Sequence, residues 1–280
     1  MDIINGERAI MNTNHKIKFL LKNASDLDFN IDDAEISYLI NGKTNDSYLL
    51  DFKKFKLVLR LNSKNSSNLG INRQNESLIL QSLDKKNIIP NLIYMDLTYE
   101  FIIYEYIEGI ELDIRKTDSE DRKKLSSLIE SYQDIQIDLP KFNYFSHVSL
   151  YWQKIKEIKQ IGNLRENKME AFLAKLSNFQ ESNWPALLTH HDLETNILVT
   201  DSGYKIIDWE YAAMGNRYFD LASCCLINKL EINESRELVK HYAKLMNIDE
   251  HEAIAKFDLH TEIVAITNDL WFAALNANKV

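Results

Sequence analysis

The order of the elements that the sequence predicts indicates an α+β protein in two lobes. The first third of the chain reads as strands with one helix, and the remainder reads as helices around a small strand-containing insert. Strands followed by helices are typical of the α+β class. We expect the lobes to cover residues 1–105 and 106–280 and to meet near 104–110. Clefts between lobes are common ligand sites.

Strands dominate the predicted N-terminal lobe. β-Branched and aromatic residues alternate within 34–61, which predicts the strands AEISYLI, SYLLDF and KFKLVLRL. The Asn41-Gly42 pair after the first of them is a hairpin signal. Helical apolar spacing and then a second strand pair follow, over residues 73–86, 92–98 and 100–107.

Helices dominate the rest of the chain. Apolar residues recur at helical spacing in five segments, near residues 118–136, 149–181, 216–229, 233–246 and 249–277. Between them, residues 186–208 predict short strands around the sequence HHDLETN and a DSG turn. This insert carries the residues with the clearest chemical signal.

Charge and cysteine content restrict the classes of partner and compartment. The net charge of −9 argues against nucleic acid, which requires a concentrated basic face, and suits a cationic small substrate. The two cysteines, Cys224 and Cys225, are neighbours in an apolar run and are expected to be buried and reduced. The N-terminal residues lack the apolar core of a signal peptide, and no apolar run is long enough to span a membrane. We therefore expect a cytoplasmic protein; its oligomeric state is unknown from sequence.

The insert supplies the groups that phosphoryl transfer requires. Asp192 follows His190 and precedes Asn196 on a predicted loop, and Asp208 ends the strand YKII twelve residues after Asn196. Phosphoryl transfer needs one carboxylate to orient the accepting hydroxyl, and a carboxylate with an amide oxygen to hold Mg²⁺ on the phosphates. The pattern therefore predicts phosphoryl transfer that depends on Mg²⁺.

Three separated blocks of sequence resemble one known superfamily. The blocks are NGKTNDSYLL with LVLRL, then GINRQNE, then IIDWEYAAMGNRYFDLAS. They resemble the choline kinase, thiamine kinase and aminoglycoside phosphotransferase superfamily over roughly residues 34–275. The resemblance implies a bilobal protein-kinase-like fold, with a small β-rich nucleotide-binding N-lobe and a larger helical C-lobe for catalysis and substrate.

The resemblance also implies the roles of the residues in the insert. Asp192 would be the catalytic carboxylate, Asn196 and Asp208 would bind the metal, and Glu210 would support that metal or bind a second one. The superfamily places four residues between the Asp and the Asn, whereas this chain has three. Either the loop tightens and Asn196 still serves, or Glu194 replaces it as a ligand, or the site is impaired.

Nucleotide-binding roles are implied for residues in two other blocks. Arg60 would contact phosphate and Glu76, on the following helix, would pair with it. Asn45 and Ser47 lie in the turn expected to cover the phosphates. The segment 104–108 would form the hinge, with backbone groups of Glu105 and Ile107 meeting adenine.

Aromatic residues suggest the class of acceptor. The candidates that follow the metal-binding residues or lie near the C-terminus are Trp209, Tyr211, Tyr218, Trp271 and Phe272. Aromatic faces hold quaternary ammonium and thiazolium groups, and the choline kinase branch points to Tyr211 and Trp271. That branch has two Trp three residues apart near its end, whereas this chain has one there.

Taken together, these features predict an ATP-dependent kinase that phosphorylates the hydroxyl of a cationic alcohol of the choline or thiamine type. One alternative is an aminoglycoside-type antibiotic phosphotransferase, which would need a concentrated acidic loop that residues 110–180 do not provide. The other is a nucleotide-binding pseudokinase, suggested by the shortened spacing between Asp192 and Asn196.

Overall fold

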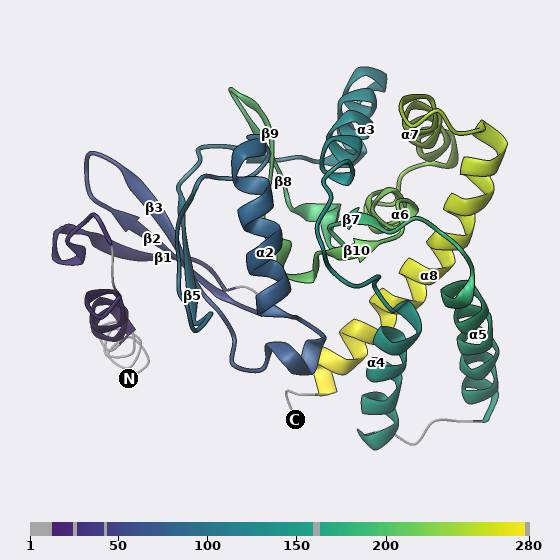
Figure 1. Cartoon of the computed structure of the whole chain (residues 1–280), viewed down its shortest axis with the longest axis horizontal. Helices are drawn as coiled ribbons and strands as arrows, with labels where there is room; N and C mark the ends of the chain where they lie inside the picture. Colours follow the sequence, from purple (N-terminus) through teal and green to yellow (C-terminus); the bar gives the residue numbers. More distant parts are fainter. Residues whose placement is uncertain (1–12, 25–26, 42–43, 159–162, 278–280) are drawn as a thin grey trace. The chain divides into compact units, whose positions relative to one another are not determined.

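The computed structural model describes residues 13–24, 27–41, 44–158 and 163–277. Its contacts divide the chain into two compact units (Figure 1). Unit 1 comprises Met1–Lys64 and Pro90–Glu108, and unit 2 comprises Asn65–Ile89 and Gly109–Val280. The functional division into lobes 1–105 and 106–280 stays a prediction. The compact units differ from these lobes, because residues 65–89 belong to unit 2 together with most of the helices.

Unit 1 is built around a five-stranded antiparallel sheet in the order β1-β2-β3-β5-β4. Gly42 and Lys43, in the predicted hairpin turn, lie outside the described residues. The strands are β1 (Glu35–Asn41), β2 (Asp46–Asp51), β3 (Lys56–Leu61), β4 (Leu92–Met95) and β5 (Phe101–Glu105). The predicted strands of this part of the chain are therefore confirmed within a few residues at each end.

The core of unit 1 lies on one face of this sheet. Leu50, Leu59 and Ile103 are fully buried there, as the alternation of apolar residues in β2 and β3 predicts. A helix over residues 13–22 packs Ile17 and Leu21 into the same cluster. The sheet is thus covered on this side and can hold polar residues of β2 and β3 in fixed register.

Unit 2 contains the longer helices and the small strands. Its helices are α2 (Arg73–Leu83), α3 (Ser119–Gln133), α4 (Tyr144–Ile158), α5 (Asn163–Glu181), α6 (Tyr218–Ile227), α7 (Ile232–Leu245) and α8 (Glu250–Ala277). The predicted helical segment 149–181 corresponds to two helices, α4 and α5. Helical structure also begins earlier than predicted there, because the Asn143 side chain accepts a bond from the Ser146 N–H and starts α4. Among the described helices, none combines the length and apolarity that crossing a membrane requires.

Two small antiparallel sheets in unit 2 carry the insert. They pair β10 with β7 and arrange the others in the order β6-β8-β9. Their strands are β6 (Ile110–Glu111), β7 (Leu187–Thr189), β8 (Ile197–Thr200), β9 (Gly203–Ile206) and β10 (Ala213–Gly215). The loop that carries Asp192 and Asn196 joins β7 to β8, and Asp208 lies just after β9. The sequence pattern missed β6 and β10, which are only two and three residues long.

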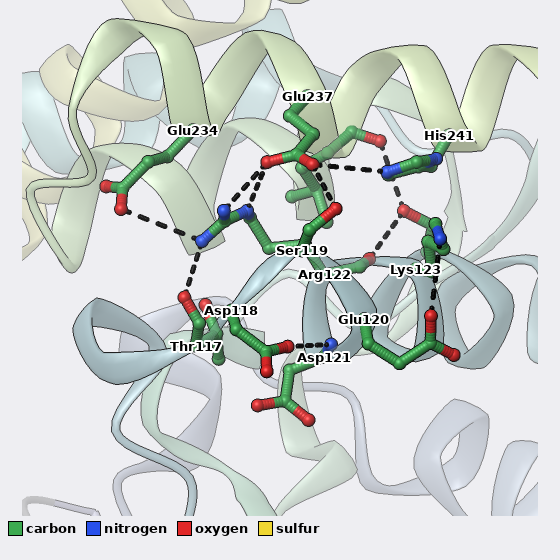
Figure 2. A network of polar contacts seen from close by, with 12 residues as sticks. Thr117, Asp118, Ser119, Glu120, Asp121, Arg122, Lys123, Glu234, Glu237 and His241 are labelled. Atoms are coloured by element: carbon green, nitrogen blue, oxygen red, sulfur yellow. Dashed lines mark hydrogen bonds and ion pairs between the residues drawn. The ribbon is translucent and has the colours of Figure 1, made fainter.

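A polar network joins α3 to α7 (Figure 2). Its centre is Arg122, whose side chain is 11% exposed and whose Nη2 lies 2.7 Å from Glu237 Oε2. Arg122 Nη1 lies 3.6 Å from Glu234 Oε1 and donates to the Thr117 carbonyl at 2.5 Å. Hydrogen bonds from Ser119 and Arg122 hold the pKa of Glu237 below its usual value. The network therefore stabilises the packing of these two helices.

We predict that Arg122→Met lowers the free energy of unfolding by about 2 kcal/mol, because charged hydrogen bonds are lost and an acceptor is left unsatisfied. In the folded protein the pKa of Glu237 lies below its ordinary value of 4.5. The stability that ionised Glu237 contributes is therefore fully present above pH 4.5, and it is lost as the pH falls through the pKa of the folded protein. The difference between wild type and variant should therefore shrink below about pH 4.5. Urea unfolding of both proteins at several pH values measures this difference in the free energy of unfolding.

The control for this prediction is Lys124→Met, which removes an exposed ion pair with Asp121 on the same helix. Exposed pairs contribute little, so this change should leave stability almost unaltered. Equal effects of the two substitutions would contradict the prediction.

Candidate active site

The loop between β7 and β8 is held by one buried carboxylate. Asp220, on α6, accepts hydrogen bonds from the N–H groups of His190 and His191, at 2.8 and 2.9 Å. It also accepts from the Tyr132 hydroxyl at 2.6 Å. Burial raises the pKa of Asp220 to about 6, and these three donors oppose the rise. His191 has a φ of 66°, a left-handed conformation that is costly for a residue with a Cβ. The carboxylate thus fixes a strained turn immediately before Asp192.

His190 connects this loop to the strand end that precedes Asp208. Its Nδ1 accepts from the Asp192 N–H at 3.2 Å, and its Nε2 lies 3.0 Å from the Ile207 carbonyl oxygen. A neutral ring with its proton on Nε2 satisfies both contacts. Burial lowers the pKa of His190 to about 4, which keeps the ring neutral. The geometry gives His190 a structural role.

The shortened loop folds back on itself. Residues Leu193–Thr195 form the 3₁₀ turn η5, and Asn196 follows directly. Asn196 Nδ2 donates to the Asp192 carbonyl at 2.7 Å and to Asp192 Oδ2 at 3.2 Å. Asn228 donates to the Glu194 carbonyl at 3.0 Å and holds the turn from outside. The loop is therefore tightened with Asn196 beside Asp192, and the metal-binding roles of Asn196 and Glu194 stay predictions.

Four carboxylates gather around this loop and are called the acidic cluster here: Asp192, Glu194, Asp208 and Glu210. Burial raises the pKa of Asp192 well above its usual value, and the charges of the other three raise it further. Asp208 has a φ of 60° and begins the 3₁₀ turn η6 (Trp209–Tyr211). Glu210 is buried and the other three carboxylates are half-buried, and such a concentration of negative charge favours a bound cation.

The acidic cluster and Asn196 contain oxygen donors of the kind that bind Mg²⁺ in proteins. Across the described residues, no three His, Cys, Asp or Glu side chains form a group that could hold a metal by themselves. Mg²⁺ is commonly bound by only one or two carboxylates, with water and phosphate oxygens as the remaining ligands. The Asp208 carboxylate and the Asn196 amide oxygen are donors of this kind, since the Asn196 nitrogen already bonds to Asp192.

One arginine compensates part of this negative charge. Arg73, the first residue of α2, lies 2.7 Å from Glu76 and 3.0 Å from Glu210, measured from guanidinium nitrogen to carboxylate oxygen. The sequence reasoning missed Arg73, although its position three residues before Glu76 predicts contact on a helix. The expected pairing of Glu76 with Arg60 stays a prediction, because the two residues belong to different units.

Tyr211 and Trp271 lie together, as the acceptor prediction requires. Trp271 Nε1 donates to the Tyr211 hydroxyl at 2.9 Å. Both side chains pack on Leu69, Ile71 and Leu275, and we call these five residues the Tyr211–Trp271 cluster. Burial raises the pKa of Tyr211, and the charges of Glu210 and Asp192 contribute. The aromatic pair therefore adjoins the acidic cluster within unit 2.

Tyr151 is a second residue that the sequence did not indicate. It is fully buried on α4, and its hydroxyl donates to the Leu69 carbonyl at 2.8 Å. Burial raises its pKa, as do the charges of Asp192 and Glu210. No local motif marks this position; only the packing of α4 brings it to the site.

The residues predicted to bind nucleotide lie largely in unit 1. Ser47 and Arg60 are direct partners across β2 and β3. Asn45 accepts from the Ser63 N–H at 3.3 Å, and Arg60 Nε donates to Asn62 at 3.1 Å. Asn45, Ser47 and Arg60 thus share one end of the sheet.

The predicted hinge lies at the end of β5. The Glu105 N–H bonds to the Asn91 carbonyl at 2.9 Å, so an adenine contact from this residue would have to come from its own carbonyl. Ile107 follows in the segment after β5 and is half-buried. Their roles stay predictions.

Similar proteins support the kinase interpretation of the fold. A LicA homologue from Mycoplasma capricolum subsp. capricolum is 29% identical over 205 residues, which are 72% of this chain and 76% of that protein. The choline kinase LicA from Streptococcus pneumoniae has a TM-score of 0.72 at 22% identity, with 88% and 87% of the two chains covered.

Two further solved structures are similar. A Plasmodium vivax ethanolamine kinase has a TM-score of 0.70 at 21% identity, covering 91% of this chain and 79% of that one. LicA in complex with AMP has a TM-score of 0.71 at 21% identity, covering 94% and 90%. The predicted α+β, protein-kinase-like fold is therefore confirmed.

The family follows from the sequence match over most of the chain. Residues 35–256 match the family described as "APH: Phosphotransferase enzyme family". This range includes the strands of unit 1, Arg73 and the whole acidic cluster. The chain belongs to the phosphotransferase enzyme family.

Proposed function

We propose that this protein is an ATP-dependent kinase that phosphorylates the hydroxyl of a small cationic alcohol, with choline as the first candidate. The observation that carries the proposal is the position of the Tyr211–Trp271 cluster beside the acidic cluster in one unit. An aromatic face and nearby carboxylates attract an ammonium group. The similar choline and ethanolamine kinases favour choline or ethanolamine over thiamine.

Each group of the acidic cluster has a proposed task. Asp192 orients the hydroxyl and accepts its proton as the phosphoryl group transfers. Asn196 and Asp208 would hold Mg²⁺, with Glu210 beside them, and the bound ion would supply positive charge beside the phosphates. The tightened loop supports turnover over the pseudokinase alternative, because it keeps Asn196 next to Asp192.

ATP is the proposed phosphoryl donor. Asn45, Ser47 and Arg60 would meet its phosphates, Glu76 would orient Arg60, and Glu105 and Ile107 would meet adenine. The clustering of Asn45, Ser47 and Arg60 at one sheet end supports this assignment, and so does the similar LicA structure with AMP. Use of ATP and the two buried free cysteines favour a cytoplasmic location.

An ATP-consumption screen of the purified protein tests the proposal. The acceptors are choline, ethanolamine, thiamine and an aminoglycoside, each with and without Mg²⁺. We expect turnover with choline or ethanolamine that requires Mg²⁺. Turnover with the aminoglycoside alone would establish antibiotic phosphorylation instead, and nucleotide binding without turnover on any acceptor would favour a pseudokinase.

We predict that Asp192→Asn keeps the fold and ATP binding but lowers kcat by ~10²–10⁴-fold, the usual contribution of a positioned general base. Steady-state kinetics with the best acceptor measure the loss. Asp201→Asn, in the exposed turn between β8 and β9, is the control and should behave as wild type. Near-normal kcat in Asp192→Asn would refute its catalytic role.

We predict that Asp208→Ala weakens Mg²⁺-dependent ATP binding more than Asn196→Ala does. A carboxylate attracts the ion through its charge, whereas the amide offers only a dipole, and Asn196 is partly engaged by Asp192. Calorimetric titration with ATP, in Mg²⁺ and in EDTA, measures both variants. Equal losses would show that Asn196 contributes as much as the carboxylate.

We predict that Trp271→Ala raises the acceptor KM by roughly 2- to 30-fold, from about 0.5–2 kcal/mol of cation–π attraction, and leaves the ATP KM nearly unchanged. Trp271→Phe retains an aromatic face and should recover most of the affinity. A folded Trp271→Ala protein with an unaltered acceptor KM would exclude the aromatic contact.

A further inference from the structure

Arg73, at the start of α2, contacts two glutamates and a serine. Its side chain is 11% exposed, and those of Glu76 and Glu210 are each 1% exposed. Its Nη1 lies 2.7 Å from Glu76 Oε2, and its Nη2 lies 3.0 Å from Glu210 Oε2. Nε and Nη2 also donate to Ser66 Oγ, at 3.2 and 3.0 Å. One cation therefore holds two buried carboxylates and a hydroxyl from three separate segments.

The local backbone explains how Arg73 reaches these partners. Ser66 belongs to the 3₁₀ turn η2 (Ser66–Leu69), which ends at Gly70 with a left-handed φ of 77°. A glycine adopts this conformation without strain, and it turns the chain toward α2. Asn72 then caps α2 by accepting from the Asn75 N–H. Side chains of a helix lean toward its N-terminus, so Arg73 lies over the η2 turn.

We propose that Arg73 is a positioning residue for phosphoryl transfer, which fixes the η6 turn by bridging Ser66, Glu76 and Glu210. The inference rests on the proposed function. Within η6, Glu210 belongs to the acidic cluster and the next residue, Tyr211, belongs to the Tyr211–Trp271 cluster. A displacement of this short turn moves a residue of each cluster at once.

The contact of Arg73 with Ser66 also affects the Tyr211–Trp271 cluster. Ser66 and Leu69 share the η2 turn, and Leu69 packs against Tyr211 and Trp271. The Leu69 carbonyl also accepts from the Tyr151 hydroxyl. Arg73 therefore ties two walls of the proposed acceptor site together, and through Glu210 it sets where those walls lie relative to Asp192.

The shape of the guanidinium matters as well as its charge. Arg73 uses nitrogens on different edges of a rigid planar group, whereas a lysine offers one compact ammonium at the end of a flexible chain. Arg73→Lys keeps the positive charge between the two carboxylates but cannot hold three partners in one fixed geometry. This substitution separates positioning from charge compensation.

Arg122 provides a matched control (Figure 2). Its side chain is also 11% exposed, and it is also ion-paired with two glutamates, Glu234 and Glu237. These partners lie on α7, outside the candidate site. Arg122→Lys therefore imposes a comparable change on a buried arginine that has no proposed part in the reaction.

The experiment compares Arg73→Lys, Arg122→Lys and wild type by kinetics, thermal unfolding and hydrogen exchange. For Arg73→Lys we expect kcat to fall ~10–100-fold, the effect of a displacement near 1 Å, with smaller changes in both KM values. Exchange should increase in η2 and η6 together. Arg122→Lys should lower thermal stability and increase exchange in α3 and α7, with kcat unchanged.

Several outcomes would overturn the inference. Wild-type kcat in folded Arg73→Lys would show that charge alone suffices, and unchanged exchange in η6 would show that Arg73 does not fix this turn. An equal fall of kcat in both variants would assign the loss to general destabilisation. Wild-type protein that is inactive on every alcohol would refute the proposed function and this inference with it, whereas active wild type with unaffected Arg73→Lys refutes the inference alone.

Discussion

The buried carboxylate of Asp220 is the constraint on which the rest of the site depends. It accepts hydrogen bonds from the N–H groups of His190 and of His191, whose backbone is left-handed, and from the Tyr132 hydroxyl. A buried carboxylate is tolerated only when such donors surround it. Two of those donors, the N–H groups of His190 and His191, belong to the turn before Asp192. The hydrogen bonds that satisfy Asp220 therefore also orient the proposed catalytic residue. His190 then extends this order to the strand end before Asp208.

A second constraint is the balance of charge. The acidic cluster concentrates four carboxylates in a partly buried region, which is unfavourable unless cations are present. Arg73 compensates Glu210 and Glu76 permanently, while Asp192 and Asp208 are the groups that a bound metal and a cationic acceptor would compensate. A site of this kind is stabilised by the ligands it is proposed to use, and an aromatic pair beside it gives an ammonium group a place away from the metal.

Sequence patterns predicted the strands of unit 1, the helices of unit 2 and the residues of the insert, because each depends on local spacing. Asp192, Asn196 and Asp208 stand in a loop–strand–turn order that folding preserves. The patterns missed β6 and β10, which are too short to show periodicity. They also missed Tyr151, which reaches the site only because α4 packs against the η2 turn. Arg73 lies three positions before Glu76, which suggests a contact on a helix, but nothing local connects Arg73 to Glu210, 137 positions later.

What the sequence by itself determined is the set of chemical groups and the family: the carboxylates, the amide and the aromatic residues occur in a recognisable order. What only the tertiary structure decided is which of them touch. The three-residue spacing between Asp192 and Asn196 allowed several geometries, and the 3₁₀ turn with its clamp from Asn228 selects one. The spacing of apolar residues predicts only which face of a helix or strand is buried. Contacts between residues distant in sequence depend on how the helices and turns pack against one another, which this spacing does not specify.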